Sequence, residues 1–456
     1  AALAFASGIN KFVIHESAHQ PSDTLVPGAG LFQFGLWFNR HETWAGMARP
    51  WMDYLARSSF LLQQGVYVAD ILLYYGDDNN ITGLYGANPP EIPLGYSFDY
   101  INSKGLSGAV TPKNGKLVTD SGMSYEVLVL GDNCRRISTA MLRRIIDLAN
   151  SGITVCGTLP EIPAGRNDDD KTFGELRAQL EGLMEKGPLS QVLNKKGIRP
   201  DCAVPSKNIR FVHRRLADRD IYWVWNSGKK AVPADLKLRV PEGKILEIWN
   251  PENGKQYSTS FRNQGTGISA SLEMAPECAR FLVVKYDGQA APEAPAEPLQ
   301  SISVQGPWTI RFQAGRGAPE SVTWTSLKDW TTDPDGGIRY FSGTADYTTT
   351  LPLNEVPDQP VMISLGEVKN IARVTVNGTE CGIAWKHPFA VDIPSGILKA
   401  GDNTITISVA NLWVNRIIGD LQPGCTHTYT SVPWDFYKAD SPLLPSGLLG
   451  PVELKY

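Results

Sequence analysis

Two clusters of polar residues each follow an apolar run that has the pattern of a β-strand. Residues 15–21 (HESAHQP) follow residues 11–14 (KFVI), and residues 76–80 (GDDNN) follow residues 65–75 (GVYVADILLYY). Strands that end in polar side chains and are joined through a helix are typical of βα units in a barrel, whose active site lies at the carboxyl ends of the strands. The pattern therefore predicts that both clusters lie on the active-site face of such a barrel.

The first cluster matches H-E-x-x-H, the zinc-protease signature, through His15, Glu16 and His19. The motif works on a helix, which places both imidazoles on one face and lets the glutamate activate water. The strand-like residues before the motif and Pro21 after it leave no length for that helix. A zinc peptidase, in which Glu42 would be the third ligand, is therefore the least favoured alternative.

The second cluster places four oxygen-bearing side chains, Asp77, Asp78, Asn79 and Asn80, directly after an apolar strand. Such a group can supply a catalytic carboxylate or ligate a hard cation such as Ca²⁺. Asp and Asn also favour ordinary turns, so an acidic turn without a function is the alternative. The expected position at the end of a barrel strand favours the functional interpretation.

The segment between the clusters contains a helix predicted over residues 43–64. Trp44, Met47, Trp51 and Leu55 recur at helical spacing, and a glycine follows at position 65. Pro50 interrupts the pattern, so we expect a kink or two short helices. The spacing favours core packing for these tryptophans.

Residues 96–206 have the pattern of an α/β domain. A strand over residues 125–130, a helix capped by Ser138 and a parallel strand over residues 153–157 follow one another. Cys156 has no acidic or histidine partner near it in the sequence, which makes it a poor nucleophile candidate. The three aspartates at 168–170 are expected to form a solvated loop, with a metal site as the less favoured alternative.

The length of 456 residues is too great for one domain and suggests about three or four. A (β/α)8 barrel needs about 250 residues, so this chain is expected to be the C-terminal part of a longer protein. We predict a multidomain chain of the α/β plus β class. Its first two domains are the C-terminal portion of a (β/α)8 barrel at 1–95 and a flavodoxin-like α/β domain at 96–206. A small β-sandwich at 207–287, a Pro/Ala linker at 288–301 and a jelly-roll-like β-sandwich at 302–456 follow.

The net charge of −4 gives no electrostatic footprint for nucleic acid or an anionic membrane. No transmembrane run or complete signal peptide is visible in the sequence. The six cysteines form no C-x-x-C pair, which argues against zinc-ribbon and thioredoxin-like sites, and Cys156 and Cys278 are expected to be buried thiols.

Two stretches of the last domain combine aromatic residues with amide and charged groups. They are residues 385–389 (WKHPF) and 411–416 (NLWVNR). Such groups can line a sugar site or pack against a neighbouring domain, and we favour packing.

In its order of motifs the chain resembles the C-terminal half of glycoside hydrolase family 106, the α-L-rhamnosidases. The stretches that carry the resemblance are residues 10–21 (NKFVIHESAHQP), 38–44 (FNRHETW), 54–65 (YLARSSFLLQQG) and 68–80 (VADILLYYGDDNN). The last domain is similar to the sugar-binding β-sandwich of family 2 glycosidases through residues 365–368 (LGEV), 376–378 (VNG) and 385–389.

The resemblance implies removal of terminal α-L-rhamnose from a polysaccharide or glycoside with inversion, a dependence on Ca²⁺ and no organic cofactor. Inversion uses a general acid and a general base about 6.5–9.5 Å apart. The family pattern implies a glutamate after the Tyr-Tyr-Gly strand end, where this chain has Asp77. A carboxylate that is one methylene shorter is displaced by about an ångström, which can cost about a hundredfold in rate.

The resemblance also assigns roles to the remaining cluster residues. The second catalytic carboxylate would lie in the N-terminal segment of the same protein, which this chain lacks. Ca²⁺ would be ligated by Asp78 and Asn79. The substrate contacts would be His15, Glu16, His19, Gln20, Arg40, His41 and Trp44.

A non-catalytic carbohydrate-binding or structural remnant is the main alternative, because an incomplete barrel cannot hold two carboxylates in register. Location in the periplasm or outside the cell is expected from the polysaccharide substrate and not from any residue of the chain.

Overall fold

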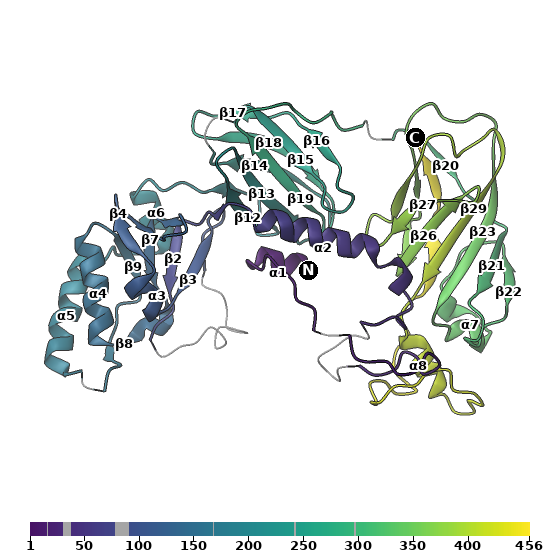
Figure 1. Cartoon of the computed structure of the whole chain (residues 1–456), viewed down its shortest axis with the longest axis horizontal. Coiled ribbons are helices and arrows are strands. Elements are labelled where there is room, and N and C mark those ends of the chain that lie inside the picture. The colour runs from purple at the N-terminus through teal and green to yellow at the C-terminus, as the bar shows by residue number, and fades with distance from the viewer. Residues whose placement is uncertain (16, 31–37, 78–90, 167, 241–242, 296–297) are drawn as a thin grey trace. The chain divides into compact units, whose positions relative to one another are not determined.

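The computed structural model describes the chain except for residues 16, 31–37, 78–90, 167, 241–242 and 296–297. The chain forms two compact units, one of residues 1–11 and 57–294 and the other of residues 12–56 and 295–456. Both are rich in strands and contain few helices (Figure 1). Among the described residues, no helix has the length and apolar character needed to cross a membrane.

A four-stranded parallel sheet in the first unit has the order β3-β2-β7-β9. Every residue of β2 and β7 is buried, as expected for parallel strands that are covered on both faces. Helices α4 and α5 pack on one face and α6 on the other (Figure 1). The bounds are β2 (Ile71–Tyr74), β3 (Phe98–Ile101), β7 (Val127–Leu130), β9 (Thr154–Gly157), α4 (Thr139–Asn150), α5 (Asp170–Leu183) and α6 (Leu189–Lys195).

The strand, helix and parallel strand predicted from residues 125–157 are confirmed. Ser138 caps α4 by accepting a hydrogen bond from the backbone N–H of Met141 at 3.3 Å. The apolar stripe of α4 is buried, which explains why its helical period was visible in the sequence. Cys156 and Cys278 are buried thiols, as predicted, and burial raises the pKa of Cys156 to about 11.

The single strand predicted over residues 65–75 is divided into two strands in different sheets. β1 (Val66–Tyr67) pairs antiparallel with β12, whereas β2 pairs with β3 and β7. The prediction of one strand was wrong because both halves are apolar, and nothing in the pattern marks the change of sheet. Asp77 therefore follows a strand whose neighbours, β3 and β7, both lie beyond residue 95.

Two antiparallel sheets in the first unit share one core, to which strands of both contribute. Their orders are β1-β12-β13-β19-β15-β16 and β11-β14-β18-β17. The strands predicted near 220–226, 236–240, 245–249 and 280–285 are all present. The bounds are β11 (Cys202–Ala203), β12 (Ile209–Arg215), β13 (Arg219–Asn226), β14 (Val232–Leu238), β15 (Ile245–Trp249), β16 (Gln256–Ser258), β17 (Arg262–Asn263), β18 (Ile268–Met274) and β19 (Ala279–Lys285).

The short elements of the first unit connect these sheets. β4, β5 and β6 form a three-stranded antiparallel sheet, and β8 pairs in parallel with β10. The bounds are α1 (Ala2–Ala6), α3 (Ser103–Gly108), η4 (Asp132–Arg135), β4 (Thr111–Lys113), β5 (Lys116–Val118), β6 (Ser124–Tyr125), β8 (Arg136–Ile137) and β10 (Ile162–Pro163).

The second unit contains two larger antiparallel sheets around one core, with the orders β22-β21-β23-β29-β26-β27 and β20-β31-β24-β28. The strands predicted near 308–312, 345–351, 372–376 and 404–409 are confirmed. Bounds are β20 (Ser301–Ser303), β21 (Trp308–Phe312), β22 (Ser321–Trp324), β23 (Thr344–Leu353), β24 (Val361–Ser364), β26 (Ile371–Val376), β27 (Thr379–Ala384), β28 (Ala390–Ile393), β29 (Gly401–Ala410) and β31 (Glu453–Lys455).

The remaining elements of this unit are η5 (Trp330–Thr332), α7 (Gly336–Arg339), α8 (Val414–Asp420) and the pair β25 (Glu367–Lys369) and β30 (Gly447–Gly450). The hairpin predicted at Asn377-Gly378 joins β26 to β27. Both residues have positive φ, 50° and 81°, which a two-residue turn of this kind requires.

Two predictions, a strand and a helical segment, concern the first part of the second unit, and only the helical segment is confirmed. The strand predicted over residues 11–14 is absent, because this run has no strand paired with it in the described chain and Val13 is 85% exposed. The helical segment consists of η2 (Ala45–Met47) and α2 (Arg49–Leu62), so it divides just before Pro50, as expected. Met47 is buried against Ile371 and Ala410 of the C-terminal sheets.

Candidate active site

Asp77 lies just beyond the carboxyl end of β2 and is held by three other residues. Its Oδ1 accepts hydrogen bonds from the hydroxyl groups of Tyr74 and Ser103, and its Oδ2 accepts one from the backbone N–H of Ser138 at 2.7 Å. Tyr74 ends β2, Ser103 begins α3 and Ser138 is the N-cap of α4. Three elements therefore fix the orientation of this carboxylate.

These contacts keep Asp77 ionised. Burial acts to raise the pKa of its carboxyl, but the hydrogen bonds from Ser103, Tyr74 and Ser138 together outweigh burial and lower the pKa below its ordinary value. Oδ1 accepts two hydrogen bonds and Oδ2 only one, so Oδ2 keeps a lone pair that can accept from water. The geometry provides a fixed negative charge with low basicity.

The N-terminus of α4 holds a second carboxylate. Asp168 Oδ2 accepts hydrogen bonds from the backbone N–H groups of Thr139 at 3.0 Å and Gly165 at 2.8 Å. Its neighbour Asp169 caps α5 through the N–H of Thr172. The hydrogen bonds lower the pKa values of both aspartates. The acidic run at 168–170 thus contributes two hydrogen-bonded carboxylates, where the sequence predicted only a solvated loop.

His15 and His19 lie in irregular, exposed backbone, and residues 11–15 and 17–22 form no helix. Without a helix, the two imidazoles lack the i, i+4 arrangement of a zinc-protease site. Glu16 falls outside the described residues, as do Asp78 and Asn79. No group of three or more His, Cys, Asp and Glu side chains suited to a metal is present among the residues whose placement is described.

Gln20 is buried and its amide bonds to the neighbouring loop. Its Nε2 donates to the carbonyls of Ala18 at 3.1 Å and Ala29 at 2.6 Å, and its Oε1 accepts from the N–H of Ala29 at 2.9 Å. Gly28 has a φ of +83°, and a Cβ there would lie 2.1 Å from Gln20 Oε1. These contacts favour a structural role for Gln20 over the sugar contact predicted from the resemblance.

Arg40 and His41 meet at Asp23, a residue that the sequence did not single out. Arg40 donates to Asp23 Oδ1 through Nε at 2.8 Å and Nη2 at 2.6 Å, and His41 Nε2 lies 3.4 Å from the same oxygen. The hydrogen bonds from Arg40 and then His41 lower the pKa of Asp23. Arg40 Nη2 also donates to the carbonyl of Gln20 at 2.9 Å, so three predicted site residues are linked here.

Trp44 belongs to an aromatic group formed with Phe38 and Trp51. The Trp44 and Trp51 rings meet edge to face at 5.9 Å, and Phe38 lies 6.3 Å from Trp44 and 6.0 Å from Trp51 between ring centroids. Part of the Trp44 side chain packs on the core around Met47. The packing predicted from the helical spacing is therefore present.

Glu42, in the segment 38–44, is partly buried, which the sequence did not reveal. Within the described chain its Oε2 is buried and has no hydrogen-bond partner. Burial raises the pKa of its carboxyl to about 7, although hydrogen bonds from Thr43 and Trp44 act to lower it. Glu42 entered the sequence interpretation only as a third zinc ligand, because no pattern announces that a polar residue will be buried.

The two aromatic stretches of the last domain pack as favoured. Trp413 is 1% exposed, and the Asn411 amide bonds to the Phe341 carbonyl at 2.8 Å and the Ser446 hydroxyl at 3.0 Å. The Trp385 ring lies 5.6 Å from that of Tyr54.

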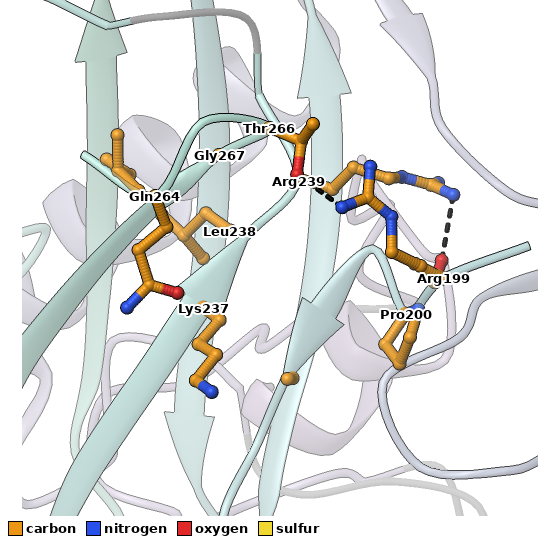
Figure 2. Close-up of a pocket in the computed structure, with 10 residues that line it drawn as sticks. Arg199, Pro200, Lys237, Leu238, Arg239, Gln264, Thr266 and Gly267 are labelled. Atoms are coloured by element: carbon orange, nitrogen blue, oxygen red, sulfur yellow. Dashed lines mark hydrogen bonds between the residues drawn. The ribbon is translucent and has the colours of Figure 1, made fainter.

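A separate cavity of about 210 Å³ lies where β11, β14 and the turn before β18 meet (Figure 2). Arg199, Lys237 and Arg239 line it and no lining residue is acidic. Arg199 donates to the Thr266 hydroxyl, and Arg239 donates to the Arg199 carbonyl at 2.9 Å and to Asp70 at 2.8 Å. The cations suit an anionic group, but a lining without a carboxylate has no acid or base for glycoside hydrolysis.

Comparison with known proteins agrees with the motifs. A family model described as alpha-L-rhamnosidase, that of glycoside hydrolase family 106, matches residues 1–263, which is more than half of the chain. The solved structure of a rhamnosidase from Novosphingobium sp. PP1Y has a TM-score of 0.87 and 35% sequence identity, and the match covers 99% of this chain and 45% of that one. The chain is therefore a glycoside hydrolase by family. It belongs to family 106, the α-L-rhamnosidases, and the predicted resemblance is confirmed.

A curated relative carries a different name. A protein of Formosa agariphila, provisionally named beta-glucuronidase, is 34% identical over an alignment that covers 99% of this chain and 60% of the relative. This chain therefore spans 60% of the length of the Formosa relative and 45% of the length of the Novosphingobium rhamnosidase.

Proposed function

We propose that the protein containing this chain hydrolyses terminal α-L-rhamnosides of polysaccharides or glycosides with inversion of configuration. The observation that carries the proposal is the family match across residues 1–263, which includes the strand end at Asp77 and the segment 38–44. The missing segment would supply the (β/α)8 barrel, because the described strands of residues 1–95, β1 and β2, pair instead with β12 and with β3 and β7.

Asp77 is the proposed carboxylate of this chain that acts on water. An inverting enzyme needs one carboxylate that is ionised, and the three hydrogen bonds keep Asp77 ionised across the neutral range. Its lowered pKa makes it a weak base, and Oδ2, which accepts one hydrogen bond from Ser138, is the oxygen that would accept from the attacking water. His15, His19, Arg40 and His41 remain the proposed contacts to sugar hydroxyls.

Ca²⁺ is proposed from the family resemblance, with Asp78 and Asn79 as its ligands. The described residues do not add to this set, because both oxygens of Asp77 already accept hydrogen bonds and no other cluster of ligands is present there. We therefore assign no step of the reaction to the cation.

We also propose the fold of each domain from its sheets. The two sheets around one core support a small β-sandwich near 207–287, and the larger pair supports a jelly-roll-like sandwich in 302–456. The parallel sheet and its helices support a flavodoxin-like domain that starts before residue 96, since it contains β2. A polysaccharide substrate would place the protein in the periplasm or outside the cell.

Carbohydrate binding without hydrolysis is the second candidate, and one observation favours it. A cavity of about 720 Å³ in the first unit has four aromatic residues among those that line it, Tyr67, Tyr96, Phe98 and Tyr100. This volume lies within the range of small-molecule sites, about 300–1,000 Å³. Aromatic faces pack against sugar rings, so this cavity would hold a saccharide without supplying chemistry.

The test is a comparison of two substrates with the full-length protein. Release of the phenol from an aryl α-L-rhamnoside, with little or none from the matching aryl β-D-glucuronide, is the expected result. Preference for the glucuronide would replace the proposed substrate, as the name of the Formosa relative suggests. Binding of rhamnose-containing oligosaccharide without turnover of either compound would favour the second candidate.

A further inference from the structure

The cavity lined by Arg199, Lys237 and Arg239 has a wall of fixed backbone (Figure 2). In the turn before β18, the N–H of Gln264 donates to the Gly267 carbonyl at 2.9 Å. A Cβ at Gly267 would lie 2.2 Å from the carbonyl oxygen of Leu238, the last residue of β14, so only glycine lets the turn approach this strand so closely. The turn therefore holds its lining residues in place.

Arg239 supports the cavity and has little charge left for a ligand. Its Nη2 donates to Asp70 at 2.8 Å and lies 3.5 Å from Asp201 Oδ1. Its Nη1 donates to the Arg199 carbonyl at 2.9 Å. Because two carboxylates balance its charge, the role of Arg239 is to position the backbone of Arg199.

Arg199 and Lys237 carry the charge that is available to a ligand. The Arg199 guanidinium makes one hydrogen bond to the described residues, from Nη1 to the Thr266 hydroxyl, so its other N–H donors are open. Lys237 is exposed, and its ammonium has no hydrogen bond or ion pair within the described ranges. Asp235, on the same face of β14, accepts from the Ser271 hydroxyl and does not line the cavity.

The size and polar groups of the cavity fit one charged substituent of a sugar. Its volume of about 210 Å³ is below the range of about 300–1,000 Å³ typical of sites that enclose a whole small molecule. A guanidinium binds the oxygens of an oxyanion in pairs, and an ammonium adds a point charge. The Gln264 amide N–H donates to the Ser269 hydroxyl at 3.0 Å, which leaves its carbonyl oxygen for a hydroxyl group of the sugar ring.

We propose that this cavity binds the oxyanion group of an acidic saccharide, a carboxylate or a sulfate ester. Arg199 and Lys237 are its charged contacts, and Gln264 accepts from the sugar ring. The saccharide follows from the glycoside hydrolase family of the chain. The site goes beyond the proposed rhamnoside hydrolysis, because none of its lining residues is a partner of Asp77, and the first unit alone forms it.

Isothermal titration calorimetry of the full-length protein tests the site with glucuronate, glucose 6-sulfate and neutral glucose. At least one of the two sugar acids should bind, with an affinity that falls as the salt concentration rises. Glucose should bind more weakly than that acid. The acid that binds more tightly identifies the group as carboxylate or sulfate.

Substitutions in the lining locate the binding. Arg199→Gln and Lys237→Gln should each weaken binding of the preferred acid about 10–100-fold, because each removes hydrogen bonds between charged groups. Arg199→Lys keeps the charge without the paired geometry and should lie between wild type and Arg199→Gln. Both side chains are exposed, so neither change removes a core contact. Lys230→Gln, at an exposed turn of the same unit, is the matched control and should bind as wild type.

Absence of binding by both acids, or wild-type affinity in both Arg199→Gln and Lys237→Gln, would overturn the proposal. Inorganic sulfate or acetate that binds as tightly as the matching sugar acid would also overturn it, because the sugar would then contribute nothing. Calorimetry measures binding and not turnover. Failure of the wild-type enzyme to hydrolyse any rhamnoside would therefore overturn the proposed function and leave this site supported by its own result.

Discussion

The backbone N–H of Ser138 donates a hydrogen bond of 2.7 Å to Oδ2 of Asp77, which joins the end of β2 to the start of α4. The two residues are 61 positions apart in the sequence. With the Tyr74 and Ser103 hydroxyls on Oδ1, this contact makes Asp77 part of the framework of the parallel sheet as well as the candidate catalytic carboxylate. Substitutions at Asp77 should therefore change both stability and activity.

Asp77→Ala should lower the free energy of unfolding by about 2 kcal/mol or more, because hydrogen bonds to a charged group contribute about 1.5–3 kcal/mol each and unpaired donors remain behind. Urea unfolding followed by circular dichroism measures the change. Asp120→Ala, at an exposed turn of the same unit, is the control and should stay near wild type. Equal stability of the two variants would show that the hydrogen bonds at Asp77 do not hold the sheet and helix together.

The second prediction concerns His213, which lies fully buried between two carboxylates. Its Nδ1 is 2.9 Å from Asp201 Oδ2 and its Nε2 is 2.8 Å from Asp220 Oδ1. Burial opposes protonation, but Asp201 and Asp220 outweigh it and raise the pKa of His213. Burial likewise opposes ionisation of Asp220, and His213, Tyr286 and Arg215 outweigh it and lower the Asp220 pKa.

The raised pKa of His213 and the lowered pKa of Asp220 determine how the free energy of unfolding changes with pH. Stability from His213 is complete below its unfolded pKa of about 6.5 and is lost as the pH rises through its higher folded pKa. Stability from Asp220 is complete above its unfolded pKa of about 3.9 and is lost as the pH falls through its lower folded pKa. The free energy of unfolding should therefore be greatest between these limits.

His213→Gln should remove the decline in stability above pH about 6.5 and cost about 3–5 kcal/mol, because two buried carboxylates lose their cation. Urea titrations at a series of pH values measure both effects. His427→Gln, a change at an exposed histidine, should leave the profile unaltered. If His213→Gln keeps the wild-type slope, His213 is not the group that titrates.

A third prediction tests the contact between Gln20 and Gly28. Gly28→Ala combines an unfavourable φ of +83° with a clash against Gln20 Oε1, whereas Gly8→Ala has a similar φ, +94°, and open space around its Cβ. The difference between the variants isolates the clash. Amides at 18–29 should exchange hydrogen faster in Gly28→Ala, and the matching change should be absent around Gly8. Unchanged exchange at 18–29 would mean that Gln20 does not order this loop.

Metal removal is the fourth prediction. A calcium chelator should reduce rhamnoside hydrolysis, and Ca²⁺ should restore it better than Mg²⁺, because a flexible set of carboxylate and amide oxygens prefers the larger ion. Asp78→Ala should weaken the restoration. Full activity after exhaustive chelation would contradict the calcium proposal and leave the proposed role of Asp77 unaffected.

The sequence predicted those elements whose pattern is local. The stripe of α4 from Met141 to Leu148, its Ser138 cap and the Asn377-Gly378 turn each depend on residues within a few positions of one another. The change of sheet between Tyr67 and Ile71 has no local sign, because a strand needs a partner that the pattern does not name. For the same reason the apolar run at 11–14 was mistaken for a strand.

The candidate site was predictable only in part. Asp77, Arg40 and His41 were found through their positions in motifs. Two of the three partners of Asp77 come from 26 and 61 residues away, and Asp23 reaches Arg40 across 17 residues, so spacing alone could not pair them. Burial of the Glu42 carboxyl oxygen Oε2 depends on the three-dimensional structure, and no period in the sequence describes it.

The most direct test of the account follows the anomeric proton by NMR while the full-length enzyme hydrolyses an aryl α-L-rhamnoside. A general acid and a general base acting on opposite faces invert the anomeric centre, so β-L-rhamnose should form first and then equilibrate with the α-anomer. First formation of α-L-rhamnose would show retention and contradict the proposed role of Asp77 as the base that acts on water. Release of no rhamnose would contradict the central claim itself.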